Sequence, residues 1–236
     1  TNARLGTGEV LVAEADESDG SFVKLAPTWC VVTNVDPEHL DHFGTHAAIK
    51  TAFVDFINRI PFFGLAVVCL DHEHVRDILP RIEKRYTTYG LSAQADYRAH
   101  SLSFHGIESR FRLLRRGEDL GEFAVRMPGA HNVLNCLAAI AICDELQVPL
   151  DVAREAIASF GGVHRRFTIL GEPGGVLVVD DYGHHPAEIR ATLGAAKSGF
   201  GRRVVMAFQP HRHTRTRDCF EEFVRCFDQA DELFVL

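Results

Sequence analysis

The chain has 236 residues, of which 46% are hydrophobic and 24% are charged, and its formal net charge is −7 at pH 7. This composition is typical of a folded globular protein and excludes collagen-like, disordered and disulfide-rich classes. No apolar run reaches the roughly 18 residues of a membrane span, and six cysteines without a C-x-x-C pair predict reduced core thiols. The first residues do not form a basic-then-apolar leader, so we expect a cytoplasmic protein with no membrane partner.

Charge is distributed unevenly along the chain. Residues 1–41 contain eight acidic and two basic side chains, whereas residues 202–217 contain five arginines, two histidines and no acid. Each cluster alone is consistent with a solvated surface. Together, an acidic region for a cation and a basic region for an anion favour a phosphate substrate bound with Mg²⁺. The net negative charge, with one Trp and four Tyr, argues against a nucleic-acid partner.

The first part of the chain predicts alternating strands and helices. Apolar runs at residues 9–15, 29–33 and 65–70 predict strands. Apolar residues spaced three or four apart predict helices at 45–59 and 73–79. This alternation indicates a mostly parallel sheet.

Residues 85–128 have a different pattern. Short stretches of alternating polar and apolar residues are separated by glycine turns, which is typical of antiparallel ribbons. Two helices are predicted to follow, at 131–146 and 150–160.

The pair Gly161-Gly162 interrupts the helical pattern, so we expect a boundary near residue 164 between domains 1–163 and 164–236. The second domain then begins a new series of strands and helices. Because a doubly wound domain rarely stops on a strand, we expect the C-terminal domain to be only partly present. The predicted fold class is α/β, with a mostly parallel central sheet, an antiparallel subsheet and a partial Rossmann-like C-terminal domain. The elements predicted after the boundary are strands at 166–171, 175–181, 203–207 and 232–236, and helices at 186–198 and 214–229.

Polar clusters follow four of the predicted strands, at residues 14–19, 33–42, 180–186 and 209–217. Ligands of open α/β sheets bind beyond the carboxyl ends of strands. Four separate solvated loops are the alternative, but a single convergent site explains the density of charge better.

Two residues of the first half are candidate metal ligands. Glu14 ends the first predicted strand, where a carboxylate can hold Mg²⁺ beside a triphosphate, or is an ordinary acid at a sheet edge. His39 has Glu38 and Asp41 as neighbours that could orient its ring, or is a structural histidine.

The second half of the chain offers groups suited to a nucleotide and an anion. Asn132 and Asn135 lie on one helix face and can meet an adenine edge, although capping explains Asn132 equally well. Asp181 follows a strand, where acids bind ribose hydroxyls. Arg212 and Arg215 can share one carboxylate or phosphate.

The sequence contains no G-x-x-x-x-G-K-[ST] motif and no Gly-Lys dipeptide. If ATP is the substrate, we expect its phosphate cradle to lie outside these 236 residues.

Six segments taken together strongly resemble the Mur ligase family. Members of that family have a UDP-substrate domain, a central ATPase domain and a Rossmann-like C-terminal domain. The resemblance implies that this chain begins inside the central domain, after its phosphate loop, and ends within the third. The six segments are LVAEADESD (11–19), TNVDPEHLDHFG (33–44), PGAHNVLN (128–135), GVHRRF (162–167), VDDYGHHP (179–186) and FQPHRHTRTRD (208–218).

The resemblance implies ATP-dependent amide formation through an acyl phosphate, with ATP and Mg²⁺ as cofactors. Its DESD and QPHR-x-TRTR stretches favour the branch that joins L-alanine to UDP-N-acetylmuramate in peptidoglycan precursor synthesis. We expect the chain by itself to be inactive, because the loop lysine is absent. A muropeptide ligase of the same family and a non-catalytic nucleotide-binding module are the alternatives.

The resemblance also assigns roles to individual residues. It implies Glu14 and His39 as Mg²⁺ ligands, and places His184 near the transferred phosphoryl group. Lys50 aligns roughly with a lysine that is carbamylated in some members of the family. The remaining residues that it implies are His131, Asn132 and Asn135 at the adenine, Arg166 and Asp181 at the ribose and phosphates, and Tyr182, His211, Arg212 and Arg215 in the alanine pocket.

Overall fold

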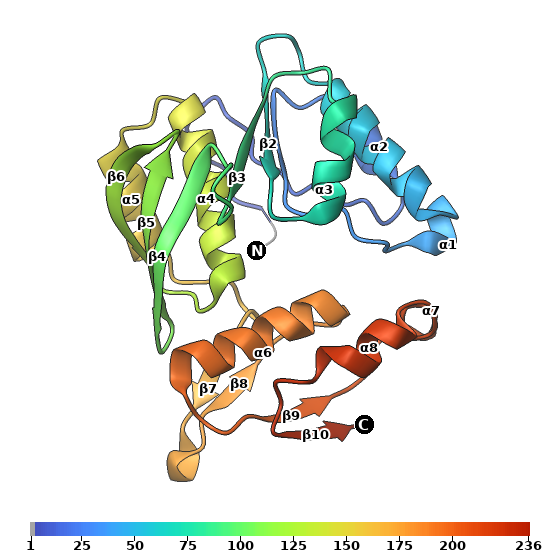
Figure 1. Ribbon diagram of the computed structural model, residues 1–236, viewed down its shortest axis with the longest axis vertical. Coiled ribbons are helices and arrows are strands. Elements are labelled where there is room, and N and C mark those ends of the chain that lie inside the picture. Colours follow the sequence, from blue (N-terminus) through green and yellow to red (C-terminus); the bar gives the residue numbers. More distant parts are fainter. Residues whose placement is uncertain (1–2) are drawn as a thin grey trace.

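The computed structural model describes residues 3–236, the side chain at position 41 excepted. The chain forms two lobes (Figure 1), here called the N-terminal lobe (residues 3–160) and the C-terminal lobe (residues 168–236). A linker of irregular structure joins them. Among the described helices, none has the length and apolar character needed to cross a membrane. All six cysteines are free thiols, as predicted.

A six-stranded sheet forms the centre of the N-terminal lobe. The pairs β1–β2, β2–β3 and β3–β4 are parallel, whereas β4–β5 and β5–β6 are antiparallel. This arrangement confirms the predicted parallel sheet with an antiparallel subsheet. One detail differs, because the strand predicted to begin the antiparallel ribbon (β3) is parallel to both neighbours. In spatial order the strands are β1 (Trp29–Val32), β2 (Leu65–Cys69), β3 (Tyr86–Gly90), β4 (Tyr97–His105), β5 (Glu108–Arg115) and β6 (Glu118–Val125).

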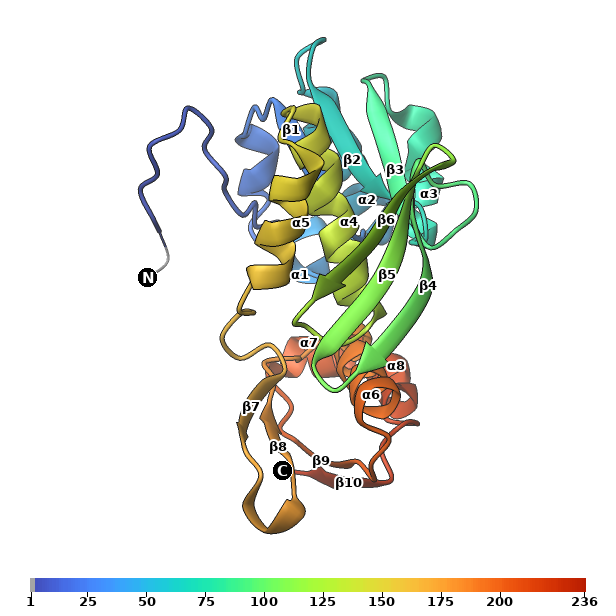
Figure 2. The ribbon, with the colours of Figure 1, turned by 90° about the vertical axis from the view of Figure 1, so that its left-hand side faces the viewer.

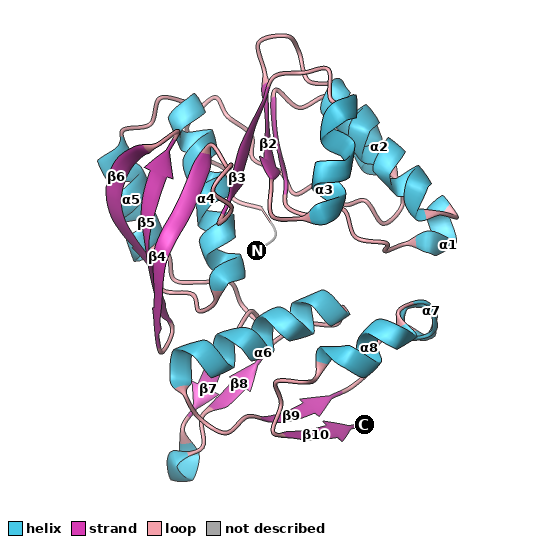
Figure 3. Ribbon diagram, viewed as in Figure 1, coloured by secondary structure: helices cyan, strands magenta, loops and turns pink. Residues whose placement is uncertain are grey.

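Helices cover both faces of the sheet at its parallel strands, whereas they cover only one face of β4–β6 (Figures 2 and 3). Every residue of β2 is buried, because successive side chains of a strand point to opposite faces and both faces are covered. Val67 packs in the cluster that includes residues of α4, and Val68 packs in the cluster that includes residues of α2. The helices are α2 (His46–Asn58) and α3 (Glu73–Ile78) on one face, and α4 (Ala130–Glu145) and α5 (Leu150–Ser159) on the other.

The strand predicted at residues 9–15 is not formed. This segment runs as an irregular chain away from the sheet (Figure 2), and Leu11 and Val12 are each about nine-tenths exposed. An apolar run becomes a strand only where a neighbouring backbone supplies hydrogen bonds. Within the described residues β1 pairs on one side only, with β2, and Val31 on this edge is exposed.

The C-terminal lobe contains two small sheets packed with helices. The strands β7 and β8 are antiparallel, whereas β9 and β10 are parallel. The helix predicted at 214–229 is divided in two at Cys219, whose φ of −107° and ψ of 21° leave the helical region. The elements are β7 (Thr168–Gly171), β8 (Val178–Asp180), α6 (Pro186–Phe200), β9 (Val205–Phe208), α7 (His213–Asp218), α8 (Phe220–Cys226) and β10 (Glu232–Val235).

The far end of α6 touches the N-terminal lobe. The backbone N–H of Gly106, in the β4–β5 turn, donates to the carbonyl of Gly199 at 2.8 Å. Gly129, which precedes α4, has a φ of +95°, and a Cβ there would lie 2.8 Å from Cβ of Ala195. A side chain at Gly129 would therefore disturb both the backbone conformation and the contact between the lobes.

Candidate functional site

The candidate site lies where the loop after β1 meets α7 and the start of α6. This loop ends in the short helix α1 (Leu40–Phe43), which faces α7 across a gap between the lobes (Figure 1). Oε2 of Glu38 lies 3.9 Å from Nη2 of Arg215, and Oε1 lies 3.5 Å from Nε2 of His185. We call the group of Glu17, Glu38, His39, His185 and Arg215 the inter-lobe seam.

Three residues on the N-terminal side of the seam offer ligands for a cation. Nε2 of His39 lies 3.6 Å from a carboxylate oxygen of Glu17 and 3.6 Å from one of Glu38, and one donor atom from each residue lies within 4.8 Å of the others. Two carboxylates and an imidazole fit a divalent cation, and Mg²⁺ typically takes one or two protein carboxylates while keeping water or phosphate ligands. These residues therefore fit the Mg²⁺ ion that the sequence predicts.

His39 is held in a conformation that favours glycine. Its φ of +55° and ψ of 36° are left-handed, and it is the residue that precedes α1. A histidine in this region is several times commoner than a bulky residue but still unusual, and such backbone conformations cluster at functional sites. The conformation directs the imidazole, which is 13% exposed, toward the two carboxylates.

The structure does not bring Glu14 into the carboxylate–imidazole group. Glu14 is exposed on the irregular N-terminal segment, and within the described part of the chain Glu17, three residues further on, contacts His39 instead. The side chain of Asp41, the other predicted neighbour of His39, lies outside the described residues.

His185 supplies the opposite side of the seam and is 3% exposed. It is the N-cap of α6, where its Nδ1 accepts the backbone N–H of Ala187 at 3.4 Å. With Nδ1 acting as acceptor, the neutral ring carries its proton on Nε2, which faces Glu38 and lies 3.9 Å from Sγ of Cys219. Burial lowers the pKa of His185 and so favours this neutral form.

Glu188 orients the histidine pair His184-His185. Its Oε2 accepts the backbone N–H groups of His184 at 2.9 Å and His185 at 3.1 Å, and its Oε1 accepts Arg166 at 2.9 Å. Burial raises the pKa of Glu188, but these hydrogen bonds outweigh it and the pKa is lowered. Glu188 is not among the residues predicted from the sequence, although a glutamate three positions after an N-cap is the signal of a capping box.

The residues predicted at the nucleotide lie at the junction of the lobes. His131, at the start of α4, has its pKa lowered chiefly by burial, and the charges of Asp181 and Arg166 act on it from the C-terminal side. Asn132 is buried and donates to the carbonyl of Pro128 at 2.8 Å, whereas Asn135 is exposed. The structure thus places His131 within the electrostatic influence of Arg166 and Asp181.

Asp181 also has a local structural role. Its two carboxylate oxygens accept the backbone N–H groups of Phe167 at 2.8 Å and Gly183 at 2.7 Å. These bonds hold the linker and the loop before α6 in place, so the carboxylate has only its remaining lone pairs for a ligand.

The residues predicted in the alanine pocket divide into two groups. Arg215 is 11% exposed and its Nη1 donates to the carbonyl of exposed His211 at 3.4 Å. Tyr182 and His184 instead contact each other, with ring centroids 5.0 Å apart, and Tyr182 stacks under the guanidinium of Arg165. A cavity of about 30 Å³ lies between the lobes beside Arg215, lined by Pro37, Glu38, His39, Leu40, Arg212, Thr214, Arg215, Asp218 and Cys219.

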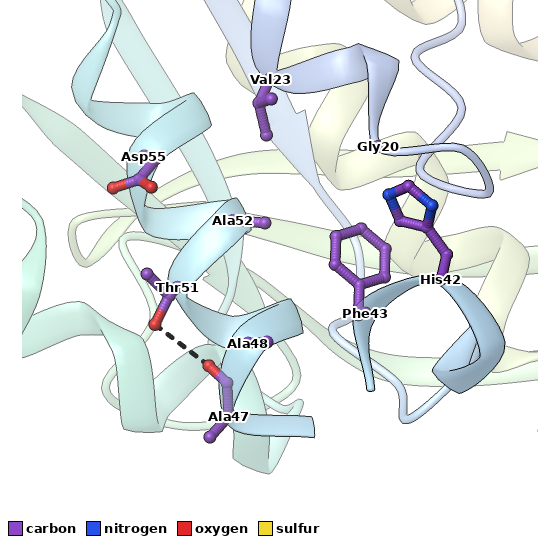
Figure 4. A pocket seen from close by; sticks show the side chains of 9 residues that line it. All are labelled: Gly20, Val23, His42, Phe43, Ala47, Ala48, Thr51, Ala52 and Asp55. Carbon is purple, nitrogen blue, oxygen red and sulfur yellow. Dashed lines mark hydrogen bonds between the residues drawn. The ribbon is translucent and has the colours of Figure 1, made fainter. Parts of the chain in front are cut away.

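Lys50 lies away from the seam. Its ammonium group is 2.7 Å from Oδ2 of Asp77, so it joins α2 to α3. A larger hollow of about 500 Å³ lies against α2 (Figure 4), and Lys50 is not among its lining residues. This hollow is open and mostly apolar, with His42 and Asp55 on opposite parts of its rim, and the predicted site residues do not line it.

The chain belongs to the Mur ligase family. The Mur ligase middle domain matches residues 2–143, and the Mur ligase glutamate ligase domain matches residues 165–236. Along its whole length the chain is 66% identical to a UDP-N-acetylmuramate–L-alanine ligase of Sorangium cellulosum, and it covers 51% of that protein. The chain thus spans about half the length of the curated relatives it matches.

Solved structures show the same fold. The UDP-N-acetylmuramate–alanine ligase of Thermotoga maritima is 31% identical and superimposes with a TM-score of 0.76, over 94% of this chain and 48% of that one. A murein peptide ligase from Psychrobacter arcticus is 26% identical with a TM-score of 0.61, over 91% of this chain and 44% of that one.

Proposed function

We propose that the protein to which this chain belongs joins L-alanine to UDP-N-acetylmuramate at the expense of ATP, in the cytoplasmic synthesis of peptidoglycan precursors. The observation that carries this proposal is the inter-lobe seam. There the candidate cation ligands around His39 lie opposite the guanidinium of Arg215. Family membership and the similarity of the whole chain to alanine-adding ligases supply the substrates.

The reaction has two steps, and both develop negative charge. The muramyl carboxylate attacks the γ-phosphate of ATP, forming an acyl phosphate and releasing ADP; the amine of alanine then attacks the acyl carbon and phosphate leaves. Magnesium, when bound, supplies positive charge at the phosphate oxygens. Glu17, Glu38 and His39 would hold it, and Arg215 would bind the carboxylate of alanine.

We assign the nucleotide to the junction of the lobes. His131, with Asn132 and Asn135 on the same helix, would meet the adenine, and Arg166 and Asp181 would bind ribose and phosphate from the C-terminal side. His184 would face the transferred phosphoryl group. Because these residues come from domains 1–163 and 164–236, movement of the lobes would change the site.

The test is a ligation assay on the product of the gene that contains this sequence. Incubation with UDP-N-acetylmuramate, ATP, Mg²⁺ and L-alanine should yield ADP, phosphate and a product heavier by one alanine residue, measured by mass spectrometry. Replacement of L-alanine by the L-alanyl tripeptide tests the muropeptide alternative. Nucleotide binding without any product would favour the non-catalytic module.

A further inference from the structure

Glu38 contacts both sides of the inter-lobe seam. Its Oε2 lies 3.6 Å from His39 and 3.9 Å from Arg215, while its Oε1 lies 3.5 Å from His185. The same carboxylate is thus a candidate cation ligand and the counter-ion of Arg215. We propose that Glu38 occupies the place of an incoming carboxylate at Arg215, and that a divalent cation which takes Glu38 uncovers this site.

Arg215 is set up to bind an anion that it does not yet contact closely. A guanidinium carries five N–H donors in a planar fork. Within the described residues, its acceptors are the carbonyl of His211 at 3.4 Å and, at the looser distance of 3.9 Å, Glu38. The Arg215 side chain is only 11% exposed, so water replaces few of the missing partners.

Glu38 is held loosely enough to be displaced. All three of its cross-contacts exceed the usual length of an N–H···O hydrogen bond. It lies on the loop between β1 and α1, and its side chain is 23% exposed. The adjoining cavity of about 30 Å³ has room for about one water molecule and is far smaller than a typical ligand pocket. An amino acid therefore enters only if Glu38 moves.

The cation site gives Glu38 a second position. Glu17 and His39 belong to the N-terminal lobe, as Glu38 does, whereas Arg215 belongs to the C-terminal lobe, so a cation bound with them draws the carboxylate toward the N-terminal lobe. Cation binding and carboxylate binding then favour each other. This coupling is reciprocal, so each ligand raises the affinity for the other by the same factor.

The experiment measures binding by calorimetry on the chain itself, with L-alanine as the probe and no nucleotide. This inference rests on the proposed function only for the choice of L-alanine. In cation-free buffer we expect Glu38→Gln to bind L-alanine at least about fivefold more tightly than the unaltered chain. Saturating Mg²⁺ should strengthen binding to the unaltered chain by a similar factor and leave Glu38→Gln unchanged.

Two matched controls isolate the effect. Glu155→Gln removes an exposed acid of α5, outside the inter-lobe seam, and it should leave L-alanine binding unchanged. L-alaninamide lacks the carboxylate, so its affinity should not respond to Glu38→Gln. If Glu38→Gln does not fold, judged by circular dichroism, Glu38→Asp shortens the side chain by one methylene and should give a smaller gain.

Equal or weaker L-alanine binding by both Glu38 variants, or no response of the unaltered chain to Mg²⁺, would overturn the proposal. Inorganic phosphate separates this failure from failure of the proposed function. If Glu38→Gln gains affinity for phosphate while L-alanine binds to neither protein, the masking by Glu38 stands and the assignment to L-alanine falls.

Discussion

Nε2 of His185 lies 3.5 Å from Oε1 of Glu38, so the residue that caps α6 also touches the loop that follows β1. One imidazole thus serves a helix end of the C-terminal lobe and a carboxylate of the N-terminal lobe. The position of the seam therefore depends on how α6 begins.

Replacement of Glu188 by alanine should destabilise the C-terminal lobe. The change removes two backbone hydrogen bonds of the capping box and the contact with Arg166. We expect a loss of about 1–2 kcal/mol in the free energy of unfolding, measured by urea titration. Glu155→Ala, at an exposed position of α5, is the control and should change little. Equal stabilities of the two variants would show that the box contributes nothing.

Binding of Mn²⁺ should distinguish Glu17 from Glu14 as a ligand. The structure places Glu17 within 3.6 Å of His39 and leaves Glu14 exposed on the irregular segment. We expect Glu17→Gln and His39→Ala to weaken Mn²⁺ binding at least about tenfold, measured by electron paramagnetic resonance, because each removes one of few protein ligands. His105→Ala, at an exposed position of β4, serves as the control.

The opposite result is equally informative. A loss of Mn²⁺ affinity in Glu14→Gln but not in Glu17→Gln would restore the pair Glu14 and His39 that the sequence predicts. It would also mean that the N-terminal segment changes position when the cation binds.

Asp96 should make the stability of the N-terminal lobe depend on pH. Burial raises its pKa, but the N–H and hydroxyl of Thr88 and the hydroxyl of Thr87 outweigh burial and lower it. Because the folded pKa lies below the unfolded value, the stabilisation is complete above about pH 4 and is lost as the pH falls through the folded pKa. Asp96→Asn should therefore reduce stability at pH 7 and flatten its decline below pH 4, followed by thermal unfolding. A decline as steep as in the unaltered chain would assign the acid sensitivity to other carboxylates.

Truncation of Phe111 should test the core of the sheet. Phe111 is fully buried on β5 and stacks on Phe123 with ring centroids 5.7 Å apart. Phe111→Ala should cost about 3–5 kcal/mol, measured by denaturant titration, because it removes contacts and leaves a cavity. Phe62→Ala is the matched control, since Phe62 is 89% exposed, and a comparable loss there would contradict the burial pattern.

Local patterns predicted most of the fold. The run at 65–70 forms β2 because its apolar residues are buried on both faces of the sheet, and Thr45 caps α2 where the periodic spacing begins. The run at 9–15 is also mostly apolar but remains irregular, because strand formation depends on a distant partner that local composition does not reveal. The interruption of the last predicted helix at Cys219 has no glycine or proline to mark it, so the sequence does not predict it.

Parts of the candidate site also required the tertiary structure. The motif around His39 predicts a site on the loop after β1, and the sequence neighbours of that histidine include Glu38. The contact of Glu38 with Arg215 joins residues 177 positions apart, and the local spacing of residues does not predict such a contact. The place of His185 in the inter-lobe seam likewise becomes visible only in the structure, where it is buried beside Cys219.

The direct backbone contact between Gly106 and Gly199 lies near the last turn of α6, whereas His185 stands at its first. This 15-residue helix is about 22 Å long, and the contact of Gly199 lies close to its C-terminal end. A tilt of about 5° around that contact would move the first turn of the helix by about 2 Å. Displacements too small to disturb the packing of either lobe would thus suffice to engage or release Glu38.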